Sequence, residues 1–502
     1  MKILIQSILW MGMLMLINPL MISAQSNHWQ DSNAEVKEKD RRYAINTNQH
    51  YQTIEGFGTS LINFGSMKEK FTSLYRTAEF QEFYVKEMGM NMLRCNLWGG
   101  VLKDPVEDWQ DITYKDFDLK VSHLKGTGNH RDVQAFVDFA KGLLELNPDA
   151  KIIGTVWSPP AWMKMNNELT GTHSGAIYGD KYEDRKTGNP IDNRLKPKYY
   201  KHYAKYLAEW VKLFEERTGK PLYGISLGNE VMFTQNFGSC VWTAEDYEEM
   251  MVELGKMLDK EGYEEVKIYG PETMTSHNSE IANPMYVDVL TETPAAEYLD
   301  VFATHGYVQG VEMEFGKTGL NEFRKLINET GKPQWITEGG TGGHRWPEPL
   351  TGIASAIHNS AVYGNVEAFT PWQIAGGGPN THCIMVYDQP TPKTYAAQHF
   401  FRYIDEGAIR VEASPKNARV KISAYLHPDN NKLTVVLINP GKTNESLQIG
   451  IQGEKNNIKE MNAWRTSETE RMRPVEDYDI NNNKITMEMP GLSVVTLKGE
   501  IE

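Results

Sequence analysis

The sequence predicts an α/β protein, a closed (β/α)8 TIM barrel with an additional all-β sandwich domain. Between about residues 54 and 405, eight short apolar runs alternate with segments of helical spacing. From about residue 408 the chain changes to short β-type runs joined by Asn, Gly and Pro turns. Alternation of strands and helices indicates a parallel sheet, and eight strands is the number that closes such a barrel.

Each predicted barrel strand is a short apolar run of strand length. The runs cover residues 54–61, 90–97, 151–158, 222–229, 266–270, 301–304, 334–337 and 366–372. An open, doubly wound sheet is the alternative for this alternation. It is less favoured, because no Gly-rich phosphate-binding loop follows the first run.

The segments between the strands carry apolar residues at the three- and four-residue spacing of one helix face. One such pattern covers residues 135–146 and is followed by Pro148. A second covers residues 203–214, and Gly219 lies where the C-terminus of that helix is expected.

The composition divides the chain into four segments. We expect a signal peptide over residues 1–24, an N-terminal segment over 25–53, the barrel over 54–405 and the sandwich over 406–502. Strand-like runs at 420–426, 432–439, 446–451 and 492–497 support the sandwich. Alternating apolar residues near Tyr43 and Ile45 predict one further strand, which joins the N-terminal segment to the sandwich.

The first residues have the pattern of an export signal. Lys2 precedes an apolar run over residues 3–22, which ends at Ser23-Ala24 before a polar stretch. Small residues at that point favour cleavage. An uncleaved anchor is the alternative, because the run is nearly long enough to span a bilayer. We therefore expect an exported protein, periplasmic or extracellular, without stable membrane insertion.

Charge and cysteine content exclude several classes of partner and site. The formal net charge is −14, which argues against binding to nucleic acid or to an anionic membrane. Cys95, Cys240 and Cys383 are the only cysteines. They have no metal-binding spacing and form no disulfide framework, so buried thiols are expected, with one bridge left open.

Two carboxylates follow predicted strands of the barrel at the end where catalytic side chains are found in this fold. Glu230 follows the fourth strand and Glu338 the seventh. Hydrolysis of a glycosidic bond needs one carboxyl that protonates the leaving oxygen and a second that is ionised. The pair therefore predicts a glycosidase, while the residues alone leave retention and inversion open.

Polar and aromatic side chains at the neighbouring strand ends fit the same interpretation. Arg94 is expected to keep the nucleophile ionised. Tyr307 is expected to donate to Glu338, and Asn229 to bind a sugar hydroxyl. The full set expected to bind substrate is Arg94, Trp157, Asn229, His305, Tyr307 and Trp372.

A zinc hydrolase is the alternative reading of the histidines. His305, His344 and His382 follow late strands and are candidates for one metal site at the barrel mouth. No HExxH motif or close His pair is present, so no metal and no cofactor are expected.

At these residues the chain resembles glycoside hydrolase family 30. The resemblance runs from about residue 43 to the C-terminus. The segments that carry it are Gly56-Phe57-Gly58, Arg94-Cys95-Asn96, Trp157-Ser158-Pro159-Pro160-Ala161-Trp162-Met163-Lys164, Ser226-Leu227-Gly228-Asn229-Glu230 and Ile336-Thr337-Glu338-Gly339. It implies a retaining enzyme without cofactor or metal, with Glu230 as acid/base and Glu338 as nucleophile.

The resemblance leaves the glycan open, because family members act on several. These include glucosylceramide, β-1,6-glucan, β-1,6-galactan, glucuronoxylan and small β-xylosides or β-fucosides. The segment after Arg94 departs from the pattern expected of glucuronoxylan enzymes, and Gly58-Thr59-Ser60-Leu61 favours a β-1,6-galactanase-like branch. An exo-acting β-glycosidase, transglycosylation and a catalytically silent glycan-binding barrel are the alternatives. The oligomeric state is not indicated.

Overall fold

The computed structural model describes residues 42–61, 68–120, 132–178, 180–274, 279–307, 311, 319–340, 342–415 and 419–502. The expected signal peptide, residues 1–24, and the part of the N-terminal segment before residue 42 lie outside this range. Among the described helices, none combines the length and the apolar character needed to cross a lipid bilayer.

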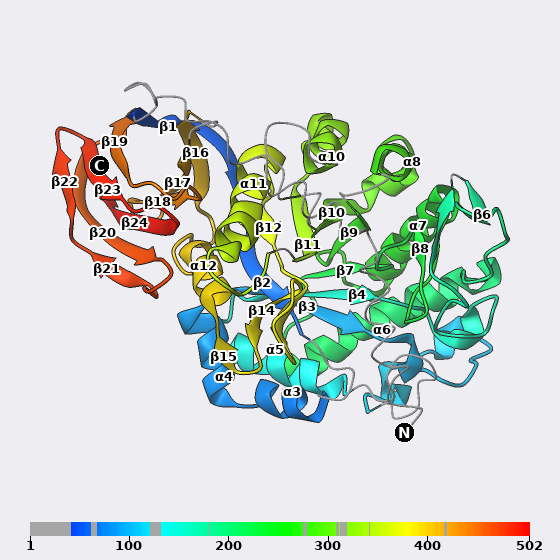
Figure 1. Ribbon diagram of the computed structural model, residues 1–502. Helices are drawn as coiled ribbons and strands as arrows, with labels where there is room; N and C mark the ends of the chain where they lie inside the picture. Colours follow the sequence, from blue (N-terminus) through cyan, green and yellow to red (C-terminus); the bar gives the residue numbers. More distant parts are fainter. Residues whose placement is uncertain are drawn as a thin grey trace. The chain divides into compact units, whose positions relative to one another are not determined.

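Eight parallel strands form a closed barrel in the order β10-β11-β12-β2-β3-β4-β7-β9 (Figure 1). Their bounds are β2 Gly56–Ser60, β3 Met92–Leu97, β4 Lys151–Val156, β7 Gly224–Ser226, β9 Lys267–Met274, β10 Leu299–Tyr307, β11 Gln334–Gly340 and β12 Ala368–Phe369. Each overlaps one of the eight apolar runs found in the sequence. The predicted fold class is confirmed.

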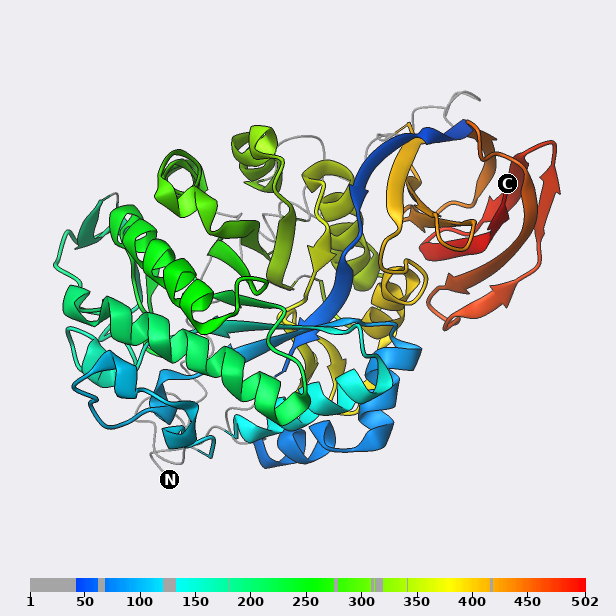
Figure 2. The same cartoon turned by 180° about the vertical axis from the view of Figure 1, so that it is seen from behind.

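Helices surround the barrel, as Figures 1 and 2 show from opposite sides. Their bounds are α3 Lys68–Tyr75, α4 Ala78–Glu82, α5 Gln134–Leu146, α6 Tyr200–Thr218, α7 Ala244–Glu261, α8 Ser279–Glu292, α10 Gly319–Ile327, α11 Ser355–Gly364 and α12 Pro392–Phe401. The two helical patterns identified in the sequence lie in α5 and α6. Gly219 caps α6 with a φ of 85°, a backbone conformation that residues with a Cβ rarely adopt.

A layer of buried side chains fills the barrel interior beneath the ends of the strands. It consists of Met92, Ile153, Tyr269, Val301, Ala303, Trp335 and Ala368. Because alternate residues of a strand face the same side, Arg94 follows Met92 inward on β3, and His305 follows Ala303 inward on β10. The side chains of Arg94 and His305 therefore lie directly above this apolar layer.

Irregularities in two strands turn further side chains inward. In the pairing of β10 with β11, Thr304 is opposite Ile336 but His305 is opposite Glu338, so one residue of β11 is skipped. In the pairing of β10 with β9, Ala303 is opposite Pro271 and Thr304 is opposite Thr273, so Glu272 is skipped. Such bulges re-aim side chains next to active sites.

The sandwich is built from one ten-stranded sheet in the order β21-β20-β24-β18-β17-β16-β1-β19-β23-β22. Its strands are β1 Arg42–Thr53, β16 Ile409–Ser414, β17 Lys421–His427, β18 Lys432–Asn439, β19 Glu445–Gln452, β20 Ile458–Thr466, β21 Arg473–Val475, β22 Tyr478–Asn481, β23 Lys484–Met489 and β24 Ser493–Ile501. Strands from both ends of this order contribute to a single apolar core.

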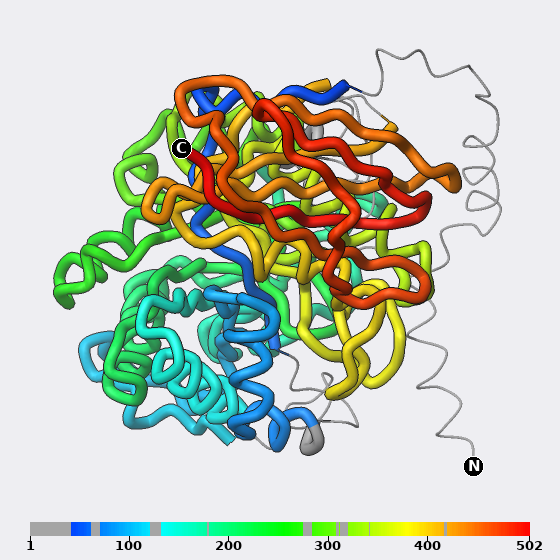
Figure 3. Tube along the Cα trace, turned by 90° about the vertical axis from the view of Figure 1, so that its left-hand side faces the viewer, coloured from blue at the N-terminus to red at the C-terminus, as the bar shows by residue number. Residues whose placement is uncertain are grey.

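Strand β1 links the two parts of the fold. It pairs with β16 in the sandwich, and only two residues separate it from β2, the first barrel strand. Figure 2 shows this blue segment passing from the sandwich into the barrel, and Figure 3 shows it beside the orange and red strands. The three cysteines are buried and form no disulfide.

Two small sheets lie outside the barrel and the sandwich. One has the order β6-β5-β8, with β5 Gly175–Tyr178, β6 Lys181–Asp184 and β8 Phe233–Thr234. The other has the order β13-β14-β15, with β13 Gln373–Gly376, β14 Cys383–Val386 and β15 Gln389–Pro390. They are inserted after barrel strands three, four and eight, where they extend the walls of the mouth.

A cavity of about 650 Å³ lies at the opposite end of the barrel, where the strands begin. Glu55, Glu367 and Lys151 are among its lining residues. Burial raises the pKa of Glu367 to about 7, and the charge of Glu55 adds to that rise. The ionised form of Glu367 is therefore a cost to stability at this end of the barrel, which in this fold carries no catalytic groups.

We expect Glu367→Gln to stabilise the protein above neutral pH. A carboxyl whose pKa is raised by folding contributes stability below its unfolded pKa of about 4.3, and this contribution is lost as the pH rises to about 7. The neutral amide avoids that loss, so at pH 8 the free energy of unfolding of the variant should exceed that of the wild type by about 1 kcal/mol, a figure reduced for solvent screening. Urea unfolding of both proteins at pH 5 and pH 8 measures this difference.

Glu265→Gln is the matched control, because Glu265 lines the same cavity but is exposed. It should leave the stability at both pH values unchanged. A Glu367→Gln protein with the wild-type difference between pH 5 and pH 8 would contradict the assignment.

Candidate active site

The two carboxylates identified from the sequence converge at the C-terminal ends of the barrel strands. Glu230 follows β7, with a left-handed φ of 48°, and Glu338 lies in β11. One carboxylate oxygen of each, together with one ring nitrogen of His305, all lie within 4.8 Å of one another. The Glu230 side chain is 15% exposed and that of Glu338 is 7% exposed, so both are accessible from the mouth.

Glu338 is held by two donors. Arg94 Nη1 donates to its Oε2 at 2.8 Å, and the Tyr307 hydroxyl donates to its Oε1 at 2.5 Å. Burial raises the pKa of Glu338, and the charge of Glu230 adds to this rise, whereas His305, Arg94 and Tyr307 lower it. The net pKa of Glu338 is raised by burial, and the Arg94 and Tyr307 donors oppose that rise by favouring the ionised form.

Arg94 is completely buried and bonds side chains from several strands. Its Nε donates to Thr155 Oγ1 at 3.2 Å, and its Nη2 donates to Asn229 Oδ1 at 2.7 Å and to Glu272 Oε1 at 3.1 Å. Burial alone would lower the pKa of Arg94, but Glu272 and Glu338 raise it. The guanidinium is therefore a permanent charge beneath the two carboxylates.

His305 lies between three carboxylates. Its Nδ1 is 3.2 Å from Glu230 Oε1 and 3.7 Å from Glu338 Oε1, and its Nε2 is 3.7 Å from Glu272 Oε1. Burial would lower the pKa of His305, but the charge of Glu338 and the bonds to Glu230 and Glu272 raise it to about 9. The ring is therefore an imidazolium at neutral pH.

The geometry bears on the metal alternative. Glu230, His305 and Glu338 are the one group of possible metal ligands among the residues that the structure describes. A protonated imidazole has no lone pair to offer a metal. His344 bonds instead to Thr391 and to the carbonyl of Asn380, so His305, His344 and His382, the histidines of the zinc alternative, do not form one cluster of ligands.

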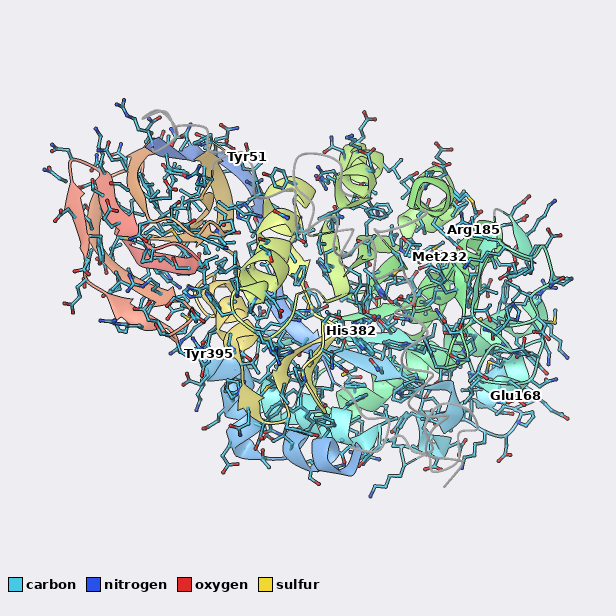
Figure 4. All side chains as sticks on the ribbon, viewed as in Figure 1. Tyr51, Glu168, Arg185, Met232, His382 and Tyr395 are labelled. Atoms are coloured by element: carbon cyan, nitrogen blue, oxygen red, sulfur yellow. The ribbon has the colours of Figure 1, made fainter. Side chains whose placement is uncertain are left out.

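Aromatic side chains form one wall of the site. The Trp157 ring is stacked 6.0 Å from Trp98 and lies 5.5 Å from Trp372, measured between centroids. Arg94 lies 4.7 Å from the centroid of Trp157 on its inner side. His382, labelled in Figure 4, meets Tyr307 edge-on at 5.5 Å. These rings offer apolar faces at which the faces of a sugar ring can pack.

All eight residues expected from the sequence lie at this end of the barrel, and six of them are joined in one network of hydrogen bonds and ion pairs. The sequence did not predict one residue of this network, Glu272. It lies in β9, which extends to Met274, whereas the apolar run ended at residue 270. A carboxylate at the end of an apolar strand was the available signal.

Comparison with known proteins gives the family. Residues 54–330 match the model of the glycosyl hydrolase family 30 TIM-barrel domain, and residues 407–497 match that of the family 30 beta sandwich domain. This chain belongs to glycosyl hydrolase family 30. As a family 30 protein it is an O-glycosyl hydrolase. The barrel match ends before Glu338, whereas the structure places β11 and β12 in the same closed barrel.

Relatives of this chain carry names that give different activities. The glucuronoxylanase XynC of Bacillus subtilis is 24% identical over 357 residues, which cover 69% of this chain and 73% of that protein. The endo-1,6-β-D-glucanase neg1 of Aspergillus fumigatus is 24% identical over 417 residues, which cover 77% and 78%. Putative glucosylceramidase 1 of Caenorhabditis elegans is 24% identical over 441 residues, which cover 79% and 76%.

Solved structures share the fold. The family 30 subfamily 8 xylanase Xyn30A of Clostridium acetobutylicum superimposes with a TM-score of 0.69 at 24% identity, over 92% of this chain and 100% of that one. An endo-β-1,6-glucanase superimposes with a TM-score of 0.61 at 18% identity, over 91% and 94%. Both carry a barrel of this kind.

Tyr307→Phe should weaken the ionised form of Glu338. A hydrogen bond to a charged group contributes about 1.5–3 kcal/mol, so kcat/KM is expected to fall about 10- to 100-fold. Because the Tyr307 bond lowers the pKa of Glu338, its loss should move the acid limb of the profile of kcat/KM against pH to higher pH. Hydrolysis of an aryl β-glycoside between pH 3 and pH 9 measures both.

Tyr425→Phe provides the control, since Tyr425 is a buried tyrosine of β17 in the sandwich, away from the site. Its profile should match that of the wild type. If Tyr307→Phe kept both the rate and the acid limb, the hydroxyl would have no part in ionising Glu338.

Proposed function

We propose that this family 30 protein is a retaining β-glycosidase in which Glu338 is the nucleophile and Glu230 is the general acid/base. The observation that carries the proposal is the approach of their carboxylate oxygens to within 4.8 Å. Carboxyls about 5–5.5 Å apart belong to retaining glycosidases, whereas inverting enzymes need about 6.5–9.5 Å to admit a water molecule. The pair leaves no room for that water.

In the first step the Glu338 carboxylate attacks the anomeric carbon, while Glu230 protonates the leaving glycosidic oxygen. The C–O bond to the leaving group breaks, and a covalent glycosyl-enzyme forms on Glu338. The bonds from Arg94 and Tyr307 fix the orientation of the attacking carboxylate. Because these donors are in place before the reaction, no reorganisation is needed as charge shifts.

In the second step Glu230 removes a proton from water, which attacks the same carbon and releases Glu338. Two inversions restore the original β configuration. His305, bonded to Glu230 at 3.2 Å, stabilises the carboxylate form that acts as base. Asn229 accepts a hydrogen bond from Arg94 through its side-chain oxygen, so the amide hydrogens of Asn229 can donate to a sugar hydroxyl. Trp157 and Trp372 pack against the sugar ring.

For the substrate we propose a β-1,6-linked glycan, a galactan or a glucan, cleaved internally. The Gly58-Thr59-Ser60-Leu61 segment favours this class, and endo-1,6-β-D-glucanases occur among the relatives. An exo-acting β-xylosidase, β-glucosidase or β-fucosidase is the second candidate. The β6-β5-β8 sheet does not decide between internal and terminal cleavage. Because β8 begins three residues after Glu230, we place this sheet beside the part of the site that binds the leaving group.

The remaining features are consistent with an enzyme that works on extracellular glycans. We infer that residues 1–24 direct export, that residues 54–405 form the catalytic domain and that residues 406–502 form the sandwich domain. The expected partner is an oligo- or polysaccharide.

Glu338→Gln should abolish cleavage while the fold is retained. The purified mature protein and this variant would be incubated with β-1,6-galactan, β-1,6-glucan, β-1,3-glucan, xylan and aryl β-glycosides. The products would then be separated by size. Cleavage of a β-1,6-glycan into a ladder of oligosaccharides, absent from the variant, is the expected result. A single monosaccharide product would favour the exo-acting alternative, and binding without any product would indicate a silent barrel.

Glu230→Ala tests the second role and serves as the companion to that variant. With an activated aryl glycoside, whose leaving group needs no proton, sodium azide should restore turnover by attacking the glycosyl-enzyme. Glu338→Gln should show no such rescue. The same response to azide in both variants would refute the division of roles.

A further inference from the structure

A third carboxylate, Glu272, lies beneath the catalytic pair. Its side chain is 0% exposed, and its backbone has a left-handed φ of 55°. It occupies the position that β9 skips in its pairing with β10. A buried charge on a strained, bulged residue is costly and persists only where its surroundings fix it.

Glu272 contacts the two cations of the site from the side away from the catalytic carboxyls. Its Oε1 accepts from Arg94 Nη2 at 3.1 Å and lies 3.7 Å from His305 Nε2. Arg94 and His305 in turn reach upward to Glu338 at 2.8 Å and to Glu230 at 3.2 Å. One carboxylate thus orients both groups that hold the catalytic pair.

The charges of this cluster can be counted. Arg94 and His305 carry two positive charges, and Glu230, Glu272 and Glu338 offer up to three negative ones. Glu272 is fully buried and lies against both cations, so its charge balances theirs from beneath. Burial would raise the pKa of Glu272, but the charges on Arg94 and His305 lower it to about 2.

The other titratable groups around Glu272 do not change this count. Tyr247 and Tyr269 face it from α7 and β9, and burial and the charge of Glu272 raise the pKa of both phenols well above the ordinary value. They therefore stay neutral. Glu338 accepts from two donors, whereas His305 is the one side chain bonded to Glu230 among the described residues.

We propose that Glu272 is a positioning residue whose charge holds the Arg94 guanidinium and the His305 ring in the places from which they contact Glu338 and Glu230. The proposal rests on the proposed roles of Glu230 and Glu338. Glu272 touches neither the reacting atoms nor the sugar. It acts through the two cations, which orient both catalytic carboxyls for the first step.

The test is a direct titration of the His305 ring by NMR of protein with labelled histidine, its signal being assigned by its loss in His305→Asn. In the wild type the ring should titrate near pH 9. In Glu272→Gln, which keeps the shape and removes the charge, the titration should move to lower pH. In Glu272→Gln, kcat for an aryl β-glycoside should also fall about 10²-fold with little change in KM, as expected when catalytic groups lose their positions.

Two further variants separate charge from structure. Glu272→Asp keeps the charge and should keep the His305 titration close to that of the wild type. Glu209→Gln removes another buried, ion-paired carboxylate, bonded to Lys205 at 2.9 Å, and should change neither the titration nor kcat.

The inference is overturned if wild-type His305 titrates near its ordinary value, a result that needs no Glu272 variant to fold. It is also overturned if Glu272→Gln leaves the titration unchanged or if Glu272→Asp behaves as Glu272→Gln does. Because the titration does not depend on turnover, a protein that cleaves no glycan would refute the proposed function and still test Glu272.

Discussion

The buried guanidinium of Arg94 joins the end of β3 to side chains that belong to four other barrel strands or the segments that follow them: Thr155, Asn229, Glu272 and Glu338. A charge with no exposed surface is stable only when its hydrogen-bonding capacity is met. The carboxylates around it meet that need, and each is thereby held in a fixed place. The geometry of the catalytic pair follows from satisfying this one cation.

The rest of the barrel makes that arrangement possible. The apolar layer that includes Met92, Ile153 and Trp335 closes the interior below Arg94, so water has no route to the cluster from beneath. Low polarity strengthens each ionic contact above it. The bulges at Glu272 and Glu338 then place carboxylates where regular strands would have pointed other side chains.

The sandwich secures the chain after the last barrel strand. His399 of α12 is bonded through both ring nitrogens to the hydroxyls of Thr496 and Thr466 in the sandwich. Burial lowers the pKa of His399 to about 3, so the ring stays neutral and acts as a fixed polar link. Lys421 of β17 likewise donates to Ser355 of α11. These links join α11 and α12 to the sandwich, and Trp372 lies in the segment of chain between these two helices.

The sequence carried enough information for the fold and for most of the site. The eight barrel strands are apolar runs of ordinary length, and Gly219 ends α6 as a left-handed residue should. Glu230 and Glu338 could be found because each follows such a run. Glu272 was missed although it lies at the end of an apolar strand, because Pro271 interrupts the run before it and its partners come from β3 and β10, which are distant in sequence. The strands β5, β6, β8 and β13–β15 are short, and the partners of β20 to β23 are set by long-range pairing, which local pattern does not encode.

The central claim is that Glu338 forms a covalent bond to the sugar. The anomeric configuration of the first product tests it most directly, and ¹H NMR can record the configuration during the first minutes of hydrolysis, before mutarotation. The account predicts that the β anomer appears first and that the α anomer grows in only as the sugar equilibrates. An initial α anomer would mean that water attacks the glycosidic carbon directly, and it would contradict the assignment of Glu338 as the nucleophile.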